Sequence, residues 1–169
     1  MSTRGDISVR APTRAEMPQV LAFIRELARY ERLEEQVVAS EADLAAALCG
    51  ERPYAEVVFG CLDGVPVGFA LFFHNFSTFL GKPGIYLEDL FVRPEARGRG
   101  VGESLLAWLA RTALERGCAR LDWAVLDWNE PSIGFYRRLG ALAQTEWTGY
   151  RLSGAPLAAL AARAPAERG

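Results

Sequence analysis

The segment from Tyr86 to Gly102 constrains the fold more than any other part of the chain, because it joins a strand pattern to a helix pattern through glycines. Its first part, residues 86–92, is rich in the aromatic and branched side chains that favour a β-strand. Pro94 ends that strand, since proline has no N–H group for the ladder. From Val101 onward, apolar residues recur with a helical period. The segment therefore predicts a strand, a tight turn and a helix N-terminus in direct succession.

The turn is rich in glycine and arginine: Gly98, Gly100, Gly102, Arg93, Arg97 and Arg99. Glycine lets several backbone N–H groups point into one concavity, and a helix N-terminus adds positive potential there. We expect the loop to bind a phosphate or pyrophosphate, with the arginines around it. A plain strand-to-helix turn with surface arginines is the alternative interpretation of the same residues.

Two familiar phosphate loops fit the segment less well. A P-loop ends in Gly-Lys followed by Ser or Thr, whereas the chain has Gly102-Glu103-Ser104. A dinucleotide-binding loop has the spacing G-x-G-x-x-G, whereas the glycines here are evenly spaced. Asp122 lies at about the distance expected for the ribose-binding acid of that fold, roughly 20 residues on, but inside the next strand pattern.

Local patterns predict further elements along the chain. Capping boxes at Thr13 and Ser40 predict helix starts, and Asp63-Gly64 predicts a hairpin between β-rich runs at 55–62 and 65–73. The other expected elements are a strand at 7–9, a loop at 75–84, a helix from 101 to about 116, a strand at 120–126 parallel to 86–92, a helix over about 130–139, final strands at 142–144 and 147–152, and a last helix at 156–163.

Composition narrows the class of protein. The formal net charge of −2 gives no electrostatic case for nucleic acid or an anionic membrane surface. No apolar run reaches membrane-spanning length, and the N-terminus lacks a signal-peptide layout. Three widely spaced cysteines argue against a disulfide framework or a zinc site. We expect one domain over residues 1–169, in the cytoplasm, with no metal and with neither nucleic acid nor a membrane as partner.

Glu88 and Asp89 are adjacent acids in an otherwise apolar strand pattern. Neighbouring strand residues point to opposite faces, so helices on both faces would bury both carboxylates. Burying a carboxylate without partners is costly, which makes an acid beside a candidate ligand loop a site candidate. Ion pairing with a purely structural role is the alternative.

Several stretches of the chain together resemble one known family. Arg97, Gly100 and Gly102 fill the order R-x-x-G-x-G, which resembles the loop that holds the pyrophosphate of acetyl-CoA in GCN5-related N-acetyltransferases (GNAT). Over about residues 7–160 the chain is similar, more closely, to the diamine (spermidine/spermine) acetyltransferases. That similarity rests on residues 24–31 and 34–37, on Tyr86-Leu87-Glu88-Asp89, and on 128–132 with Phe135-Tyr136.

The resemblance implies an α/β (α+β) GNAT fold, with a mixed central sheet of about six to seven strands and helices on both faces. It also implies acetyl-CoA as co-substrate, direct attack of a small primary amine on the thioester, and a homodimer that pairs across the edge of the sheet. Trp147 and Tyr150 are aromatic residues of the kind enriched at interfaces.

Catalytic roles follow from the same resemblance. Tyr136 matches the general acid that protonates the departing thiolate, and Glu88 matches a base that acts on the amine through water. A backbone N–H near Leu90 to Val92, where strands of the superfamily splay apart, would donate to the thioester oxygen. The expected cofactor-binding residues are Leu90, Phe91, Val92, Arg97, Gly98, Arg99, Gly100, Val101, Gly102, Asn129, Ser132 and Tyr136. The expected substrate-binding residues are Tyr30, Glu31, Glu88, Asp89, Asp127 and Trp128.

The acceptor remains open between two classes. At the positions where polyamine-specific members carry further acids, the chain has the neutral residues Thr78 and Thr148. The surroundings of Thr78 and residues 124–129 resemble the thialysine-type branch, whose acceptors are small amino acids with a side-chain amine, whereas residues 130–132 are similar to the polyamine branch. A protein amine as acceptor, and an acyl-CoA-binding sensor or regulatory module without turnover, are the further alternatives.

Overall fold

The structure, a computed structural model, describes residues 5–166. Its strands are β1 (Ile7–Arg10), β2 (Glu56–Leu62), β3 (Val65–Ser77), β4 (Lys82–Val92) and β5 (Leu121–Trp123). Its α-helices are α1 (Met17–Tyr30), α2 (Glu41–Leu48), α3 (Val101–Glu115), α4 (Glu130–Arg138) and α5 (Gly154–Ala161). Short 3-10 turns are η1 (Arg14–Glu16), η2 (Glu34–Gln36) and η3 (Pro94–Ala96).

The chain divides into two compact units, residues 1–126 and residues 127–169, and each is described by itself. The first unit carries the sheet, α1, α2 and α3, and the second carries α4 and α5. That the whole chain forms a single domain stays a prediction.

The strands of the first unit form one mixed sheet in the order β1-β2-β3-β4-β5. Neighbours from β1 to β4 are antiparallel, and β5 pairs parallel to β4 after a crossover through α3. A parallel return needs such a crossover, so the β4-α3-β5 connection is the one that the sequence predicts. The mixed α/β fold class is confirmed.

The sheet has five strands, fewer than the six to seven expected. Residues 142–144 and 147–152, expected as final strands, form no strand in the described part of the chain. A strand pattern becomes a strand only where its backbone groups find a ladder partner, and residues 127–166 supply none to one another. Leu142, Trp147 and Tyr150, which suggested these strands, are exposed.

Local signals for caps and turns are borne out. The Thr13 N–H donates to the Glu16 carboxylate at 2.9 Å, although one 3-10 turn precedes α1. At the start of α2 the Ser40 N–H donates to Asp43 at 2.8 Å, and the Asp43 N–H donates back to Ser40 Oγ at 3.2 Å. Between β2 and β3, Asp63 has φ of 51° and the glycine after it has φ of 80°. Positive φ at both central residues is what a two-residue hairpin turn requires.

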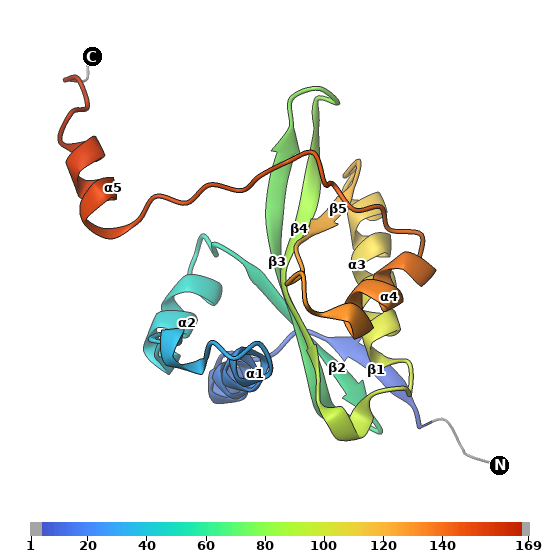
Figure 1. Cartoon of the computed structure of the whole chain (residues 1–169). Coiled ribbons are helices and arrows are strands. Elements are labelled where there is room, and N and C mark those ends of the chain that lie inside the picture. The colour runs from blue at the N-terminus through green and yellow to red at the C-terminus, as the bar shows by residue number, and fades with distance from the viewer. Residues whose placement is uncertain (1–4, 167–169) are drawn as a thin grey trace. The chain divides into compact units, whose positions relative to one another are not determined.

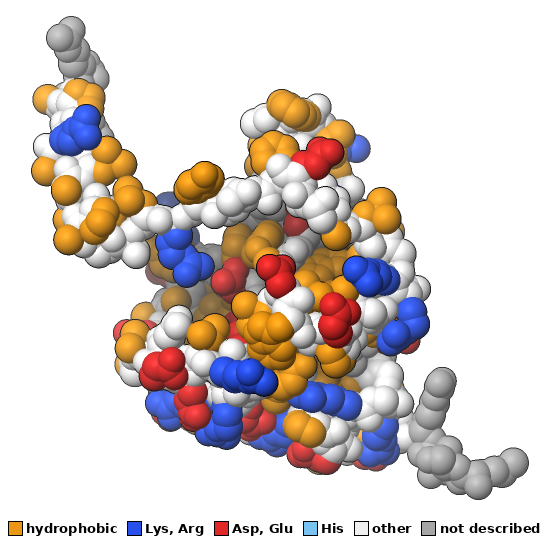
Figure 2. Space-filling view, in the orientation of Figure 1, with side chains coloured by type: hydrophobic (Ala, Val, Ile, Leu, Met, Phe, Trp, Pro, Cys, Tyr) orange, Lys and Arg blue, Asp and Glu red, His pale blue; other side chains and the backbone are white. Residues whose placement is uncertain are grey.

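The prediction of a loop over residues 75–84 is wrong, because most of these residues are in strands. β3 continues to Ser77 and β4 begins at Lys82, with Asn75 opposite Gly84 in a continuous ladder. Only residues 78–81 turn the chain. The resulting long hairpin carries exposed apolar side chains at its tip, at the top of the view in Figure 2: Phe76, Phe79 and Leu80.

Helices cover both faces of the sheet, α1 and α2 on one and α3 on the other (Figure 1). On the first, Phe23 of α1 stacks on Phe69 of β3, with ring centroids 5.6 Å apart. On the second, Phe72 of β3 meets Trp108 of α3 edge to face at 5.9 Å. We call these the α1 face and the α3 face. Gly60 of β2 lets α3 approach closely, since a Cβ there would lie only 2.7 Å from a side-chain carbon of that helix.

Candidate functional site

The glycine loop between β4 and α3 has the geometry that its sequence predicts. Gly98 and Gly100 have φ of 73° and 94°, and Gly100 is the N-cap residue of α3. These conformations favour glycine because it has no Cβ. A Cβ at Gly98 would meet no atom within 4 Å, so the loop is open on that side. The first N–H groups of a helix have no carbonyl partner inside it, so this loop and helix start can accept a phosphate group.

One of the three arginines that bracket the loop contacts α1. Arg93 donates two hydrogen bonds to Glu26 of α1, at 3.0 and 2.8 Å. Its guanidinium carbon also lies 4.9 Å from the centre of the Phe23 ring. Arg93 therefore ties the start of the loop to α1.

The other two arginines lie further along the loop. Arg97 donates from Nε to the Val92 carbonyl oxygen at 2.8 Å, and its guanidinium carbon lies 4.9 Å from the centre of the Tyr30 ring. This places the end of α1 beside the end of β4. Arg99 is exposed in the turn. Contacts of Arg97 and Arg99 with a cofactor stay predictions.

The end of β4 has an open edge where the sequence predicts one. β5 pairs only with residues 85–87, so residues 88–92 have no strand partner on that side within the first unit. The Arg93 N–H donates to β3 at 2.9 Å. Backbone groups alternate along a strand, so those of Leu90 and Val92 point to the open edge. Arg97 takes the Val92 carbonyl, and the N–H groups of Leu90 and Val92 are the donors that this geometry directs outward.

A β-bulge in β4 lies at the two acids. Leu87 pairs with Phe72 and Asp89 pairs with Leu71, which leaves Glu88 as the extra residue. Two residues of β4 thus oppose one residue of β3 at this point. Bulges of this kind redirect side chains and are common beside active sites.

The bulge places both carboxylates on one face of the sheet. The side chain of Leu87 lies on the α3 face, as does that of its β3 partner Phe72. The side chain of Phe91 lies on the α1 face, as does that of its β3 partner Phe69. Asp89 is two residues before Phe91, and Glu88 is next to Leu87, so alternation puts both acids on the α1 face. The expectation that they point to opposite faces, both buried, is therefore wrong: they lie side by side, and Glu88 is exposed.

Glu31 completes an acid cluster with Glu88 and Asp89. Burial, with the charges of Glu88 and Glu31 after it, raises the pKa of Asp89 to about 7. Partial burial also raises the pKa of Glu31, which directly follows the last residue of α1. The carbonyl end of a helix carries partial negative charge. The cluster is therefore a region of negative potential suited to a cation.

Further along the α1 face lies a polar group that sequence reasoning did not assign to the site. Asp122 pairs with Tyr86 across the β4–β5 ladder. Its Oδ2 accepts from Asn75 Nδ2 at 3.1 Å and from Arg120 Nε at 2.7 Å. Burial and, after it, the charges of Glu88 and Asp122 raise the pKa of Tyr86, so both acids are near this tyrosine. The alternation of Arg120 and Asp122 in the strand pattern is the signal that could have found this group.

The second unit carries the remaining predicted site residues. The side chain of Asn129 caps α4, accepting from the Ser132 N–H at 3.4 Å. Ser132 and Tyr136 are four residues apart and share a helix face, as expected. Asp127 and Trp128 lie just before the cap. Because this unit is described by itself, the roles of its residues in a site with Glu88 stay predictions.

Comparison with known proteins decides the family. The sequence pattern of the Acetyltransferase (GNAT) family matches residues 20–141. The chain belongs to this family. It is 36% identical to the thialysine N-epsilon-acetyltransferase of Bos taurus, over 93% of this chain and 98% of the relative. It is 31% identical to the L-ornithine N5-acetyltransferase NATA1 of Arabidopsis thaliana, over 90% of this chain and 86% of that one.

A solved structure shares the fold of the chain. An integron cassette protein from V. cholerae matches with a TM-score of 0.76 and 30% identity, over 92% of this chain and 97% of the other. The protein is therefore an N-acetyltransferase of a family that uses acetyl-CoA. In residues 5–166, no three His, Cys, Asp or Glu side chains are placed to hold a metal ion. No helix of the described chain is long and apolar enough to cross a membrane.

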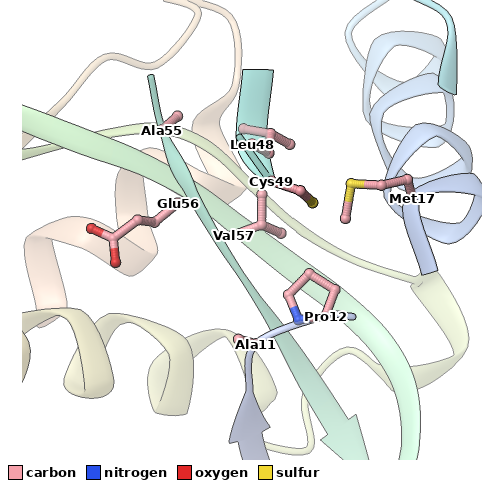
Figure 3. Close-up of a pocket in the computed structure, with 8 residues that line it drawn as sticks. All are labelled: Ala11, Pro12, Met17, Leu48, Cys49, Ala55, Glu56 and Val57. Atoms are coloured by element: carbon pink, nitrogen blue, oxygen red, sulfur yellow. The ribbon is translucent and has the colours of Figure 1, made fainter. Parts of the chain in front are cut away.

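A hollow elsewhere on this GNAT chain lacks the chemistry of a site (Figure 3). It lies between the starts of α1 and β2 and the end of α2, and is lined by Ala11, Pro12, Met17, Leu48, Cys49, Ala55, Glu56 and Val57. Its single carboxylate, that of Glu56, points away from Met17 and Cys49 in Figure 3 and binds Arg116 at 2.5 and 2.9 Å. The hollow thus offers an apolar lining without a free charged group.

Proposed function

We propose that this acetyltransferase moves the acetyl group of acetyl-CoA directly to a small primary amine bound at the acid cluster. The observation that carries the proposal is the bulge at Glu88, which gathers Glu88 and Asp89 on the α1 face beside Glu31. A protonated amine is a cation, and carboxylates at the carbonyl end of a helix attract one. The same strand leads directly into the glycine loop, so amine and cofactor sites would adjoin.

The loop residues fit the pyrophosphate of the co-substrate. Gly98 and Gly100 keep the loop free of Cβ atoms on the side where a phosphate would approach, and α3 supplies N–H groups from Val101 and Gly102. Arg97 and Arg99 would add positive charge at the rim. Leu90, Phe91 and Val92 would flank the acyl end along the open edge of β4.

Acetyl transfer forms a C–N bond and breaks the C–S bond of the thioester. One proton must leave the amine, and one must reach the departing thiolate. Glu88, exposed to solvent, is the proposed base and would take the amine proton through a water molecule. The Leu90 N–H is the proposed donor to the thioester oxygen, and Tyr136 the proposed acid that protonates the sulfur.

Substitution of Tyr136 tests the chemical step. Tyr136→Phe should cut kcat by about 10²-fold or more, while the Kd for acetyl-CoA stays nearly unchanged. Thiol release measures the first quantity and calorimetry the second. If the variant turns over like the parent across the pH range, the acid is another group.

Substitution of Glu88 tests the base. Glu88→Gln should lower the rate most at neutral pH and recover in part at high pH, where more of the amine is already deprotonated. Glu115→Gln, a similar change at the far end of α3, is the matched control and should leave the rate unchanged. An equal loss at every pH for Glu88→Gln would mean that this residue positions the amine and does not take its proton.

The rival function is an acyl-CoA-binding module without turnover. Tight binding of acetyl-CoA with no thiol release for any amine in a panel of diamines, polyamines and lysine-like amino acids would favour that rival. Release only with a peptide amine would favour a protein acceptor. The names of the relatives favour a small amino acid with a side-chain amine, and the neutral residues Thr78 and Thr148 agree with that class.

We also propose that the protein acts as a cytoplasmic homodimer with neither nucleic acid nor a membrane as partner. Exposed Trp147 and Tyr150 in the second unit support an interface there. A monomer by light scattering at micromolar concentration would overturn the dimer without affecting the chemistry.

A further inference from the structure

The polar group around Asp122 lies on the same face as the acid cluster, further along β4 and β5. Tyr86 and Asp122 are register partners, and Glu88 is two residues beyond Tyr86 in β4. Two strand residues span about 7 Å. Both places are in the first unit, so their separation is set by the sheet.

Asp122 and Arg120 are joined to each other but keep binding capacity. The ion pair uses Arg120 Nε and Asp122 Oδ2, and Asn75 also donates to Oδ2. Within the described residues, the two Nη atoms of Arg120 and Oδ1 of Asp122 take part in neither bond. The side chains are 46% and 34% exposed, so a ligand can reach them. An arginine fork is suited to a carboxylate, and a carboxylate oxygen is suited to an ammonium group.

A purely structural role explains this group poorly. An ion pair of this exposure contributes only about 0–1 kcal/mol to stability. Among the described residues, moreover, Asn75 Oδ1 is a buried acceptor with no hydrogen-bond partner. A buried acceptor left unpaired costs about 1–3 kcal/mol, so the arrangement does not maximise stability. A buried acceptor without a partner is uncommon in a folded protein, and a binding role for the group around Asp122 would explain why it is kept.

The spacing matches an amino acid with a terminal side-chain amine. An extended lysine side chain spans about 6 Å from its nitrogen to Cα, given bond lengths near 1.5 Å. With the amine at Glu88, the Cα of such a molecule would lie at the level of Asp122. Its α-carboxylate and α-ammonium groups would then meet Arg120 and Asp122. A diamine of the same length would bring a second cation to Arg120 and no carboxylate.

We propose that Arg120 and Asp122 form a subsite for the α-carboxylate and α-ammonium groups of an amino acid whose side-chain amine is acetylated. The inference rests on the proposed function for the position of the amine, and it goes further by naming the residues that select the acceptor. Asn75 holds Asp122 in place as a positioning residue, and Tyr86, the register partner of Asp122, is near both acids.

Two pairs of amines test whether the α-carboxylate is recognised. Lysine differs from cadaverine, and ornithine from putrescine, by the α-carboxylate alone. The parent should have a higher kcat/KM for each amino acid than for its diamine. Arg120→Met keeps most of the apolar stem and removes the charge, so it should lower kcat/KM for lysine by about 10- to 100-fold, mainly through KM. The value for cadaverine should stay unchanged or rise.

Two further variants separate loss of the arginine fork from loss of charge and from a general effect of removing an arginine. Arg120→Lys keeps the charge without the fork and should recover part of the lost activity with lysine. Arg111→Met, on the exposed side of α3, is the matched control and should change neither substrate. Calorimetric binding of lysine and cadaverine to the parent and to Arg120→Met tests the subsite without turnover. Weaker binding of lysine alone supports it even if no amine is acetylated, an outcome that would overturn the proposed function instead.

Either of two results would overturn the subsite. Equal losses with lysine and cadaverine in Arg120→Met would show that the ion pair only holds β5 in place. A parent that acetylates and binds the diamines as well as the amino acids, with Arg120→Met unchanged, would show that the α-carboxylate is not recognised.

Discussion

The two faces of β4 have opposite characters. On the α3 face, Ile85 and Leu87 are 0% and 2% exposed, and the helix above them is held by fully buried leucines such as Leu109. On the α1 face, the apolar packing under α1 gives way beyond the end of that helix to acids and a tyrosine. One face is therefore closed by helix packing along β4, whereas the other is closed along only part of its length.

This difference separates stability from function within one strand. A side chain on the α3 face contributes through burial, worth about 25 cal/mol for each Å² of apolar surface removed from water. A carboxylate on the α1 face lies among other acids, and its charge lowers stability while it belongs to the proposed amine site. Substitutions on the two faces should accordingly separate into losses of stability and losses of activity.

The largest effect on stability should come from the closed face. Leu109→Ala should lower the free energy of unfolding by about 2–5 kcal/mol, because it leaves a cavity between α3 and the sheet. The kcat of the folded fraction should change little, since no group of the proposed mechanism in the first unit is on this face. Urea unfolding gives the first quantity, and thiol release below the unfolding temperature gives the second.

Leu114→Ala is the matched control for that cavity. Leu114 is on the same helix but 78% exposed, so its truncation should cost less than about 0.5 kcal/mol. If the two leucines cost the same, α3 is not packed as described. A large loss of kcat in folded Leu109→Ala would instead show that the closed face supports catalysis.

A smaller change in the free energy of unfolding, a gain and not a loss, should come from substitution in the acid cluster. The folded-state pKa of Asp89, about 7, lies above its ordinary value of 3.8, so the folded state binds more protons between these pH values. Stability contributed by this group must then fall as pH rises through that range. Asp89→Asn removes the titration, and it should be about 1–3 kcal/mol more stable than the parent at pH 8 but equal to it at pH 4.

A carboxylate with a lowered pKa provides the opposite case. Hydrogen bonds from Ser40 hold the pKa of Asp43 below its ordinary value, so that group adds stability above the unfolded pKa. Asp43→Asn should therefore lower stability at pH 8, and the loss should fade only as the pH falls below the ordinary value of 3.8. Urea unfolding of Asp89→Asn at pH 8 and pH 4, and of Asp43→Asn at pH 8 and below pH 3, checks the pair. Destabilisation by Asp89→Asn at pH 8 would mean that Asp89 has a partner that outweighs its neighbours' repulsion.

The closed face was the more predictable from the sequence. Its signals are local: the apolar period of α3, the glycine turn before it and the hairpin at Asp63-Gly64 each depend on residues close in the chain. The end of α3 at Gly117 follows the same logic. Such patterns fix elements and their buried sides, because periodicity alone decides which residues share a face.

The acid face depends on contacts that no local pattern records. The bulge at Glu88 exists only because β3 and β4 pair in one particular register, and a shift by one residue would send the side chain to the other face. The pairing of Arg93 with Glu26 joins residues far apart in the chain. Family resemblance thus named Glu88 and Asp89, whose roles stay predictions, but the sequence revealed neither their common face nor the group around Asp122.

The smallest predicted effect concerns the helix ends, where the two faces differ again. α3 ends with Gly117 at φ of 70°, and α1 ends near Glu31 with Arg32 at φ of 62°. Both ends make the same pair of backbone hydrogen bonds, but only glycine adopts this conformation without strain, which costs other residues about 1–2 kcal/mol. Arg32→Gly should therefore raise the free energy of unfolding by up to about 1 kcal/mol, and Gly117→Arg should lower it by about 1–2 kcal/mol. Thermal and urea unfolding of the two variants measure both changes.

A loss of stability in Arg32→Gly would show that the contacts of the Arg32 side chain outweigh the backbone strain. A gain in stability accompanied by a higher KM for the amine would mean that the strain holds Glu31 in position, as strained residues at functional sites do.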